Sequence, residues 1–411
     1  MRKFGELGYL RYVQPPEVLS VLRLHAVDEP LFPNLKTLDL WVDDDCIPFI
    51  PLFLSQRTAI IRIGNLKYSS SKAIVASMIT TFPTRCPNLN EISLSSLPRD
   101  PMITAAVSRM LLASDRSALR SVCVDSPLTE EARQMVCKLP NLRSLSMVIE
   151  KGSSLPSVEL PSLTNLMIKF EHDSDWMWAF HGANFGKLAA VTFHSGYQQI
   201  GDFLESFERA ALTTSVQDTL SEFRLHTSCS WYPNYLSLLP FTQLMVLVIQ
   251  FSCIDGCSST VGDDVITNLA GAMPKLEILQ LGEDPCREIN AGVTAKGLMI
   301  LAHHCTDLRR LRIHFQVDSL RDLPAISGVT SGTKSNAPRK DCALTDLEVG
   351  EIPMLNESVS AVALTLAHIF PCMEGVECVD ENWYKVMEAI CVSREIIDRL
   401  GEEHRPFCTP E

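Results

Sequence analysis

The sequence predicts an α/β solenoid, shaped as a curved horseshoe with parallel strands on the concave face and helices on the convex face. Three observations predict it. A short leucine pattern recurs along the 411 residues, and stretches with helical apolar spacing lie between the copies. In addition, 46% of the residues are hydrophobic while only 7% are aromatic, so the core must be aliphatic. Such a chain can build one long, continuous core from small repeated units.

The recurring pattern is Leu-x-x-Leu-x-Leu, preceded by a Cys or Pro. Clear copies span 32–40, 86–94, 139–147, 160–168, 241–249, 273–281 and 305–313. Weaker copies start at Leu19, Leu119, Leu188, Leu220 and Leu344, and degenerate ones lie near Thr58 and Met373. The copies follow one another at roughly 20 to 36 residues, which suits leucine-rich repeats.

Each copy has a direct structural interpretation. Its second half alternates with a period of two, which indicates a short strand with one buried face. Apolar residues at helical spacing follow in 128–139, 262–273 and 294–305, and the first of these stretches carries acidic residues in its first turn, as the helix dipole favours. The Cys or Pro before the first Leu is expected to close the preceding helix. Since no single strand–helix unit can bury its apolar face alone, the units must stack.

The repeats are not interrupted by a linker, so we expect one solenoid over residues 1–381. A polar, glycine-rich stretch at about 327–341 is expected to be a flexible loop inserted within a repeat. Helical spacing also occurs in 356–370 and 382–400, and residues 382–411 are expected to form a C-terminal capping helix and tail. Residues before Leu19 offer no comparable cover, so we expect the chain to begin inside a larger protein.

Composition excludes several classes of partner. The net charge of −13 argues against a nucleic-acid binder, which usually has a basic surface. Neither a secretory signal nor a run of about 20 mostly apolar residues is present, so we expect no membrane contact. The 14 cysteines are scattered along the chain, which indicates reduced thiols and an intracellular protein, cytoplasmic or nuclear.

Motifs for catalysis or metal binding are missing. The sequence has no G-x-x-x-x-G-K-[ST], no H-E-x-x-H, no C-x-x-C pair and no G-x-S-x-G. We therefore expect no enzyme, no metal and no cofactor. The alternative, a hydrolase with an unrecognised Ser/His/Asp site, would need a deep polar pocket instead of an open concave face.

Binding is expected on the concave face, where the outward positions of the strands lie. The candidate partner-binding residues are Trp41, Asp39, His194, Arg224, His226, Arg310, Arg312 and His314. Trp41 takes an outward position beside the acidic run 43–45, and exposed aromatic side chains are common binding anchors. The alternative is that its ring lies under a neighbouring loop.

The late strand at 310–314 carries a basic strip, formed by Arg310, Arg312 and His314, on an otherwise acidic protein. Such a strip suits an acidic or phosphorylated segment of a partner protein. The alternative is that the two arginines pair with Asp346 and Glu348 on the next strand.

Several runs share their order and spacing with a known family. They span 12–25 (YVQPPEVLSVLRLH), 31–41, 48–55, 263–282, 292–315 and 344–354, and the closing helix with Trp383 continues the likeness. Together they resemble the leucine-rich region of F-box proteins expanded in mushroom-forming fungi. In that family an N-terminal F-box binds the Skp1 adaptor of a cullin–RING ubiquitin ligase, and the repeats hold the substrate. The run 14–19 (QPPEVL) is similar to the opening of an F-box, but a repeat follows it in place of the three-helix F-box with its later Trp.

The resemblance implies a non-catalytic scaffold that recognises a protein substrate on its concave face within a Skp1–cullin–F-box ubiquitin ligase. Skp1 would be a partner only if an F-box is present in the native product. The alternative is a stand-alone leucine-rich-repeat interaction or inhibitor protein with no ligase link.

Overall fold

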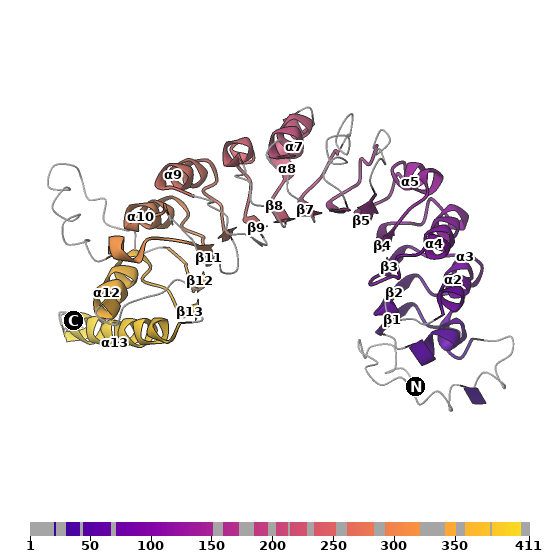
Figure 1. Ribbon diagram of the computed structural model, residues 1–411, viewed down its shortest axis with the longest axis horizontal. Coiled ribbons are helices and arrows are strands. Elements are labelled where there is room, and N and C mark those ends of the chain that lie inside the picture. The colour runs from indigo at the N-terminus through magenta and orange to yellow at the C-terminus, as the bar shows by residue number, and fades with distance from the viewer. Residues whose placement is uncertain are drawn as a thin grey trace, which may run out of the picture. The chain divides into compact units, whose positions relative to one another are not determined.

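The computed structural model contains two compact units of leucine-rich repeats (Figure 1). Unit 1 comprises Met1–Gly196 and Arg209–Thr219, and unit 2 comprises Tyr197–Glu208 and Leu220–Glu411. Within them, the structure describes residues 20–21, 30–41, 44–66, 71–150, 159–171, 185–195, 203–212, 214–227, 234–251, 261–282, 292–320, 342–350, 358–378 and 380–403.

In unit 1, each strand pairs in parallel with the next strand along the chain. The strands are β1 (Thr37–Trp41), β2 (Ile60–Gly64), β3 (Glu91–Leu94), β4 (Ser121–Pro127), β5 (Ser144–Ile149), β6 (Asn165–Phe170) and β7 (Ala190–Ser195). Between them lie η1 (Asp44–Phe53), α2 (Lys72–Thr80), α3 (Phe82–Arg85), α4 (Pro101–Ala113) and α5 (Glu130–Val136). Figure 1 shows α2, α4 and α5 on one side of these strands. The short helix α8 (Val216–Thr219) also belongs to this unit, and α7 (Phe203–Leu212) contributes residues to both units.

Unit 2 repeats the same arrangement. Its strands are β8 (Glu222–Thr227), β9 (Val246–Phe251), β10 (Ile278–Leu281), β11 (Arg310–Ile313), β12 (Asp346–Gly350) and β13 (Gly375–Cys378). The connecting helices are η3 (Tyr235–Leu238), α9 (Asp263–Ala272), α10 (Ala295–His304), η4 (Val317–Leu320), α12 (Val359–Ile369) and α13 (Glu381–Glu403).

The strands confirm the repeat pattern. Every copy except the one at Leu19, which lies outside the described residues, falls on one of these strands. The register sets equivalent core residues side by side, such as Leu145 with Leu166 and Leu279 with Leu311, and all four are buried. An aliphatic ladder of this kind is what stacked leucine-rich repeats need, because each repeat buries its apolar face against its neighbours.

The residue three positions before the first leucine closes the preceding helix. The amide of Cys305 donates to the carbonyl of Leu301 (2.8 Å), and the amide of Leu308 donates to the carbonyl of Cys305 (3.2 Å). Cys86 occupies the same place after α3, where its amide donates to Phe82. Burial raises the pKa of the Cys86 thiol to about 11 and that of the Cys305 thiol to about 12. Both cysteines are buried and therefore act as small core residues.

Adjacent repeats of unit 1 are also joined by side chains that bind the main chain of the preceding repeat. Asn88 Nδ2 donates to the carbonyl of Gln56 (3.0 Å) and Asn141 Nδ2 to that of Ser117 (2.9 Å). Ser162 Oγ continues the series, donating to the carbonyl of Pro140 (2.8 Å). These residues immediately precede the first leucine of their copies, so the repeat pattern itself places the bonds.

The expected helices are confirmed, since stretches 128–139, 262–273, 294–305, 356–370 and 382–400 fall on α5, α9, α10, α12 and α13. Trp383 at the start of α13 is fully buried, and its ring meets Phe315 edge-on with centroids 6.0 Å apart. The division of the chain at residue 382 stays a prediction, and the expected loop at 327–341 lies outside the described residues. In the described parts of the chain, no helix is long and apolar enough to cross a membrane.

Candidate functional site

In each unit, the outward side chains of the strands form a surface that we call the strand face of that unit. In β1, Leu38 and Leu40 are buried while Asp39 and Trp41 are exposed. In β11, Leu311 and Ile313 are buried and Arg310 is exposed. Most of the predicted site residues occupy such outward positions: Trp41, Asp39 and His194 in unit 1, and Arg224, His226, Arg310 and Arg312 in unit 2. His314 directly follows the end of β11. Their role in binding stays a prediction.

Trp41 is 64% exposed, so its ring does not lie under a neighbouring loop. Trp41 pairs in register with Gly64 on β2. A Cβ atom added to Gly64 would lie only 2.6 Å from Cε3 of the Trp41 ring. The indole therefore occupies the space above β2 that a larger residue at position 64 would fill.

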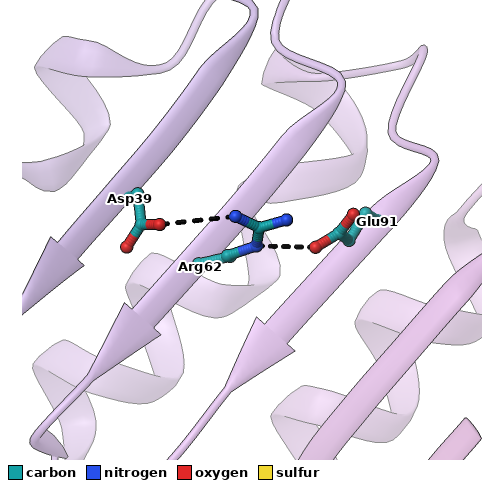
Figure 2. Close-up of polar contacts among 3 residues, drawn as sticks. All are labelled: Asp39, Arg62 and Glu91. Atoms are coloured by element: carbon teal, nitrogen blue, oxygen red, sulfur yellow. Dashed lines mark hydrogen bonds and ion pairs between the residues drawn. The ribbon is translucent and has the colours of Figure 1, made fainter. Parts of the chain in front are cut away.

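Asp39 takes part in an ion triad across three strands, which Figure 2 shows. Arg62 on β2 places Nε 2.6 Å from Oε1 of Glu91 on β3 and Nη1 3.5 Å from Oδ2 of Asp39 on β1. The hydrogen bond with Glu91 is the main reason that the pKa of Arg62 is raised. The triad holds two carboxylates and one guanidinium, so it keeps a net negative charge.

A second polar group spans β4 to β6. Lys169 Nζ lies 2.8 Å from Oδ1 of Asp125, although β5 separates their strands. The other oxygen of Asp125 accepts a hydrogen bond from the amide of Ser96 (3.2 Å), which adopts a positive φ of 56°. These bonds fix the ends of three strands together and neutralise Lys169.

His194 is half-buried on β7, at the other end of the strand series of unit 1. Six strand spacings separate it from Trp41 on β1, which corresponds to roughly 29 Å along the sheet. The two predicted residues therefore share a surface but do not belong to one compact site.

In unit 2, the polar side chains of β8 to β10 contact one another. Arg224 pairs with Glu222 on the same strand. Burial lowers the pKa of His226 below its usual 6.5, while a hydrogen bond with Gln250 works against this shift and the charge of Arg224 adds to it. Gln250 Nε2 in turn donates to Oε1 of Gln280 (3.3 Å). Among the described outward side chains of β8, β9 and β10, charge is confined to the Arg224–Glu222 pair.

The two arginines of the basic strip on β11 differ in exposure and in ion pairing. Arg310 is exposed, whereas the Arg312 side chain is only 11% exposed and its Nη1 lies 2.9 Å from Oε1 of Glu348 on β12. His314 lies beside Gly282, where an added Cβ would be 3.0 Å from its Cδ2 and where φ is +104°. Arg312 therefore pairs with Glu348 on the next strand, which is the alternative to partner binding.

Sequence reasoning missed Arg62, Glu91, Asp125 and Lys169. All four occupy outward positions of repeat copies, and this position was the signal by which the sequence could have identified them. Arg62 lies in the degenerate copy near Thr58. Their pairing depends on the register between strands and, for Lys169, on a reach across β5, which the sequence pattern does not contain. Among the residues that the structure describes, no group of three or more His, Cys, Asp or Glu side chains could hold a metal ion.

Comparisons with known proteins add little to this picture. The chain matches no family model and no curated protein. Among solved structures it is similar to an internalin from Listeria monocytogenes, with 11% sequence identity and a TM-score of 0.40 over 95% of this chain and 91% of that chain. A likeness at this identity says nothing of function.

Proposed function

We propose that this protein is a non-catalytic scaffold that binds protein partners on its strand faces. The observation that carries the proposal is Trp41, a large aromatic side chain that is 64% exposed and positioned over Gly64. Aromatic anchors of this kind supply much of the binding free energy at protein interfaces. Burial of such a ring by a partner would remove apolar surface from water, which favours binding.

The rest of the strand face in unit 1 fits a protein interface of the non-obligate type, which mixes apolar, hydroxyl and charged groups. Ser93, Ser121 and Ser144 take outward positions on β3, β4 and β5 and are half-buried. Small hydroxyl side chains let a partner approach the sheet closely and still satisfy its polar groups. The ion triad at one end and the Asp125–Lys169 pair at the other place charges beside these serines.

The proposal can be tested with a photoreactive amino acid in place of one serine. Ser93 lies on the strand face, and Ser77 lies exposed on α2, so the two positions are matched in residue type and lie on opposite sides of the repeat. In cells that make this protein, the Ser93 variant should crosslink to a partner protein that the Ser77 variant does not reach. Crosslinking from Ser77 alone, or equal crosslinking from both, would contradict binding on the strand face.

A narrower proposal follows from the resemblance to fungal F-box proteins: the strand faces would hold the substrate of a Skp1–cullin–F-box ubiquitin ligase. The F-box-like run 14–19 lies outside the described residues, so only the likeness of the sequence supports it. Protein tagged at its own locus and captured from cells should then bring Skp1 and a cullin with it. Stable partners without Skp1 would favour the stand-alone interaction or inhibitor protein instead.

A further inference from the structure

We infer that Trp41 and Asp39 together bind an arginine or lysine side chain of the partner protein. This inference rests on the proposed function and gives the chemistry of the partner at one place in unit 1. We call the pair the indole–carboxylate anchor.

The indole half of the anchor is already in place without a partner. Its benzene ring occupies the space above Gly64, with Cε3 and Cζ3 2.6 and 2.8 Å from where a Cβ atom would be. The ring therefore rests on the backbone of β2, and little side-chain freedom remains to be lost on binding. More than half of the side chain still faces solvent, where its π-electrons attract a cation.

The carboxylate half lies on the same surface. Asp39 is two residues before Trp41 on β1, so both side chains project from the same face of the sheet. The Asp39 side chain is 42% exposed, and Arg62 approaches it at 3.5 Å while making the shorter bond, 2.6 Å, to Glu91. Because the triad has one more carboxylate than guanidinium, Arg62 does not cancel the negative charge beside the indole.

Long-range charge favours the same occupant. Asp45 is exposed at the start of η1, four residues after Trp41, and the whole chain carries a net charge of −13. A basic segment would be attracted towards such a surface before contact, and the attraction would weaken with added salt. An acidic segment would be repelled.

Other occupants use only half of the anchor. A purely apolar segment would cover the indole but would remove Asp39 from water without a partner, which is unfavourable. A sugar ring would stack on the indole without using the charge of Asp39. A guanidinium or ammonium group satisfies both, because it can lie against the ring and donate hydrogen bonds to the carboxylate.

The test observes Trp41 directly in the full chain. The protein has five tryptophans, so labelling with 5-fluorotryptophan gives five fluorine signals, and the signal lost in Trp41→Phe is that of Trp41. The probe is an acetylated, amidated peptide of alternating arginine and serine. Its matched control has citrulline, which is neutral and of the same shape, in place of arginine. The Trp41 signal should shift saturably with the arginine peptide and stay unchanged with the citrulline peptide.

Two matched pairs of variants separate the anchor from diffuse attraction. Asp39→Asn removes a charge beside the indole, and Glu377→Gln removes an exposed charge on β13 of unit 2. Trp41→Leu and Tyr384→Leu each remove an exposed aromatic ring, the second on α13. Asp39→Asn and Trp41→Leu should each raise the Kd of the arginine peptide about threefold to fivefold. The two control variants should change it less than twofold, and thermal unfolding checks that all four variants fold.

Three results would overturn the anchor. Equal weakening by Asp39→Asn and Glu377→Gln would mean diffuse attraction, and an unchanged Kd in Trp41→Leu would mean that the indole takes no part. An equal shift of the Trp41 signal with methyl glucoside would indicate a sugar site instead. The scaffold is judged separately: if Ser93 still crosslinks to its partner in the Asp39→Asn and Trp41→Leu backgrounds, the anchor fails and the scaffold stands. Absence of crosslinking at Ser93 in the otherwise unchanged chain contradicts the scaffold itself.

Discussion

Trp41 and Gly64 face each other in register on β1 and β2, and the indole ring takes the place of the side chain that Gly64 lacks. A glycine within a strand normally weakens the sheet, because it has no side chain to pack. Here the neighbouring tryptophan covers the gap, as aromatic residues do beside glycines at sheet edges. The two residues should therefore act as one unit in stability and in binding.

This dependence predicts that Gly64→Ala is more destabilising while Trp41 is present, because the next neighbour of the added Cβ, Ser95 Oγ, lies farther away at 3.2 Å. An alanine Cβ would lie 2.6 Å from the ring, so the indole must move or the strands must separate. Urea unfolding of Gly64→Ala, Trp41→Ala and the double variant should give a coupling free energy of about 1 kcal/mol. Gly271→Ala on α9 is the control: nothing lies near its added Cβ, so it should stabilise by about 0.5–1 kcal/mol. If Gly64→Ala lowers the free energy of unfolding equally with tryptophan and with alanine at position 41, the two residues are not coupled.

Arg310 and Arg312 should differ in their effect on stability although they lie on the same strand. Arg312 is mostly buried and bonded to Glu348, so Arg312→Met removes this largely buried ion pair and should lower the free energy of unfolding by about 1–3 kcal/mol. Arg310 is exposed, and Arg310→Met should change it by less than about 0.5 kcal/mol. Urea unfolding of the two variants measures this difference. Similar losses in the free energy of unfolding for both would show that Arg310 is structural as well.

Asp263 ties α9 to α10 by accepting two hydrogen bonds from one residue. Its Oδ1 accepts from the amide of Thr294 (2.8 Å) and its Oδ2 from the Thr294 hydroxyl (2.6 Å). Asp263→Asn leaves one acceptor oxygen, so the free energy of unfolding should fall by about 1–2 kcal/mol. The matched variant Asp264→Asn changes the exposed neighbour in the same helical turn and should cost less than about 0.5 kcal/mol. Equal losses would assign the effect to the charge at the start of α9 instead.

His226 should make unit 2 sensitive to mild acid. Burial lowers its pKa below 6.5 in the folded protein, so the unfolded chain takes up the proton first as the pH falls. The contribution of neutral His226 is thus complete above pH 6.5 and is lost as the pH falls from 6.5 towards the folded pKa. His226→Gln should therefore lose less stability than the unchanged protein between about pH 7 and pH 5.

Urea midpoints at the two pH values measure this difference, with the exposed His303→Gln as the control for loss of a histidine. A proton NMR titration of the His226 ring gives the pKa itself. A value at or above 6.5 would contradict the structural explanation.

The sequence was sufficient to predict the repeats, because each copy of the pattern lies within a short run of neighbouring residues. The leucines of β10 at 279 and 281 follow the same pattern as those of β1 at 38 and 40, and both pairs are buried. The place of Cys305 at the end of α10 was also predictable, since the same position recurs in each copy. The helices between copies followed from apolar spacing, which for α9 and α10 fixed the ends to within one residue.

Contacts across strands were not predictable in the same way. The outward position of Arg62 follows from its repeat, but its choice of Glu91 over Asp39 as the nearer partner depends on side-chain geometry within the sheet. Likewise, Arg310 and Arg312 are equivalent in the pattern, and each has an acidic residue beside it in register on β12, Asp346 and Glu348. The burial of Arg312 and its ion pair with Glu348 depend on side-chain packing that the pattern does not contain. The exposure of Trp41 depended on what lies above β1 and β2, which no local pattern contains.

The bonds from Asn88, Asn141 and Ser162 to the carbonyls of the preceding repeats have a consequence for how such a chain can change in length. The three bonds join the repeats of β2 and β3, of β4 and β5, and of β5 and β6, so the repeat of β5 supplies a donor, Asn141, to the repeat before it and an acceptor, the carbonyl of Pro140, to the repeat after it. Duplication or deletion of that complete copy preserves this pairing, whereas an insertion or deletion of part of the copy would leave a donor or an acceptor without its counterpart. Evolution by gain and loss of whole repeats is therefore compatible with the junctions of unit 1, and shorter changes are restricted to the segments between strand and helix.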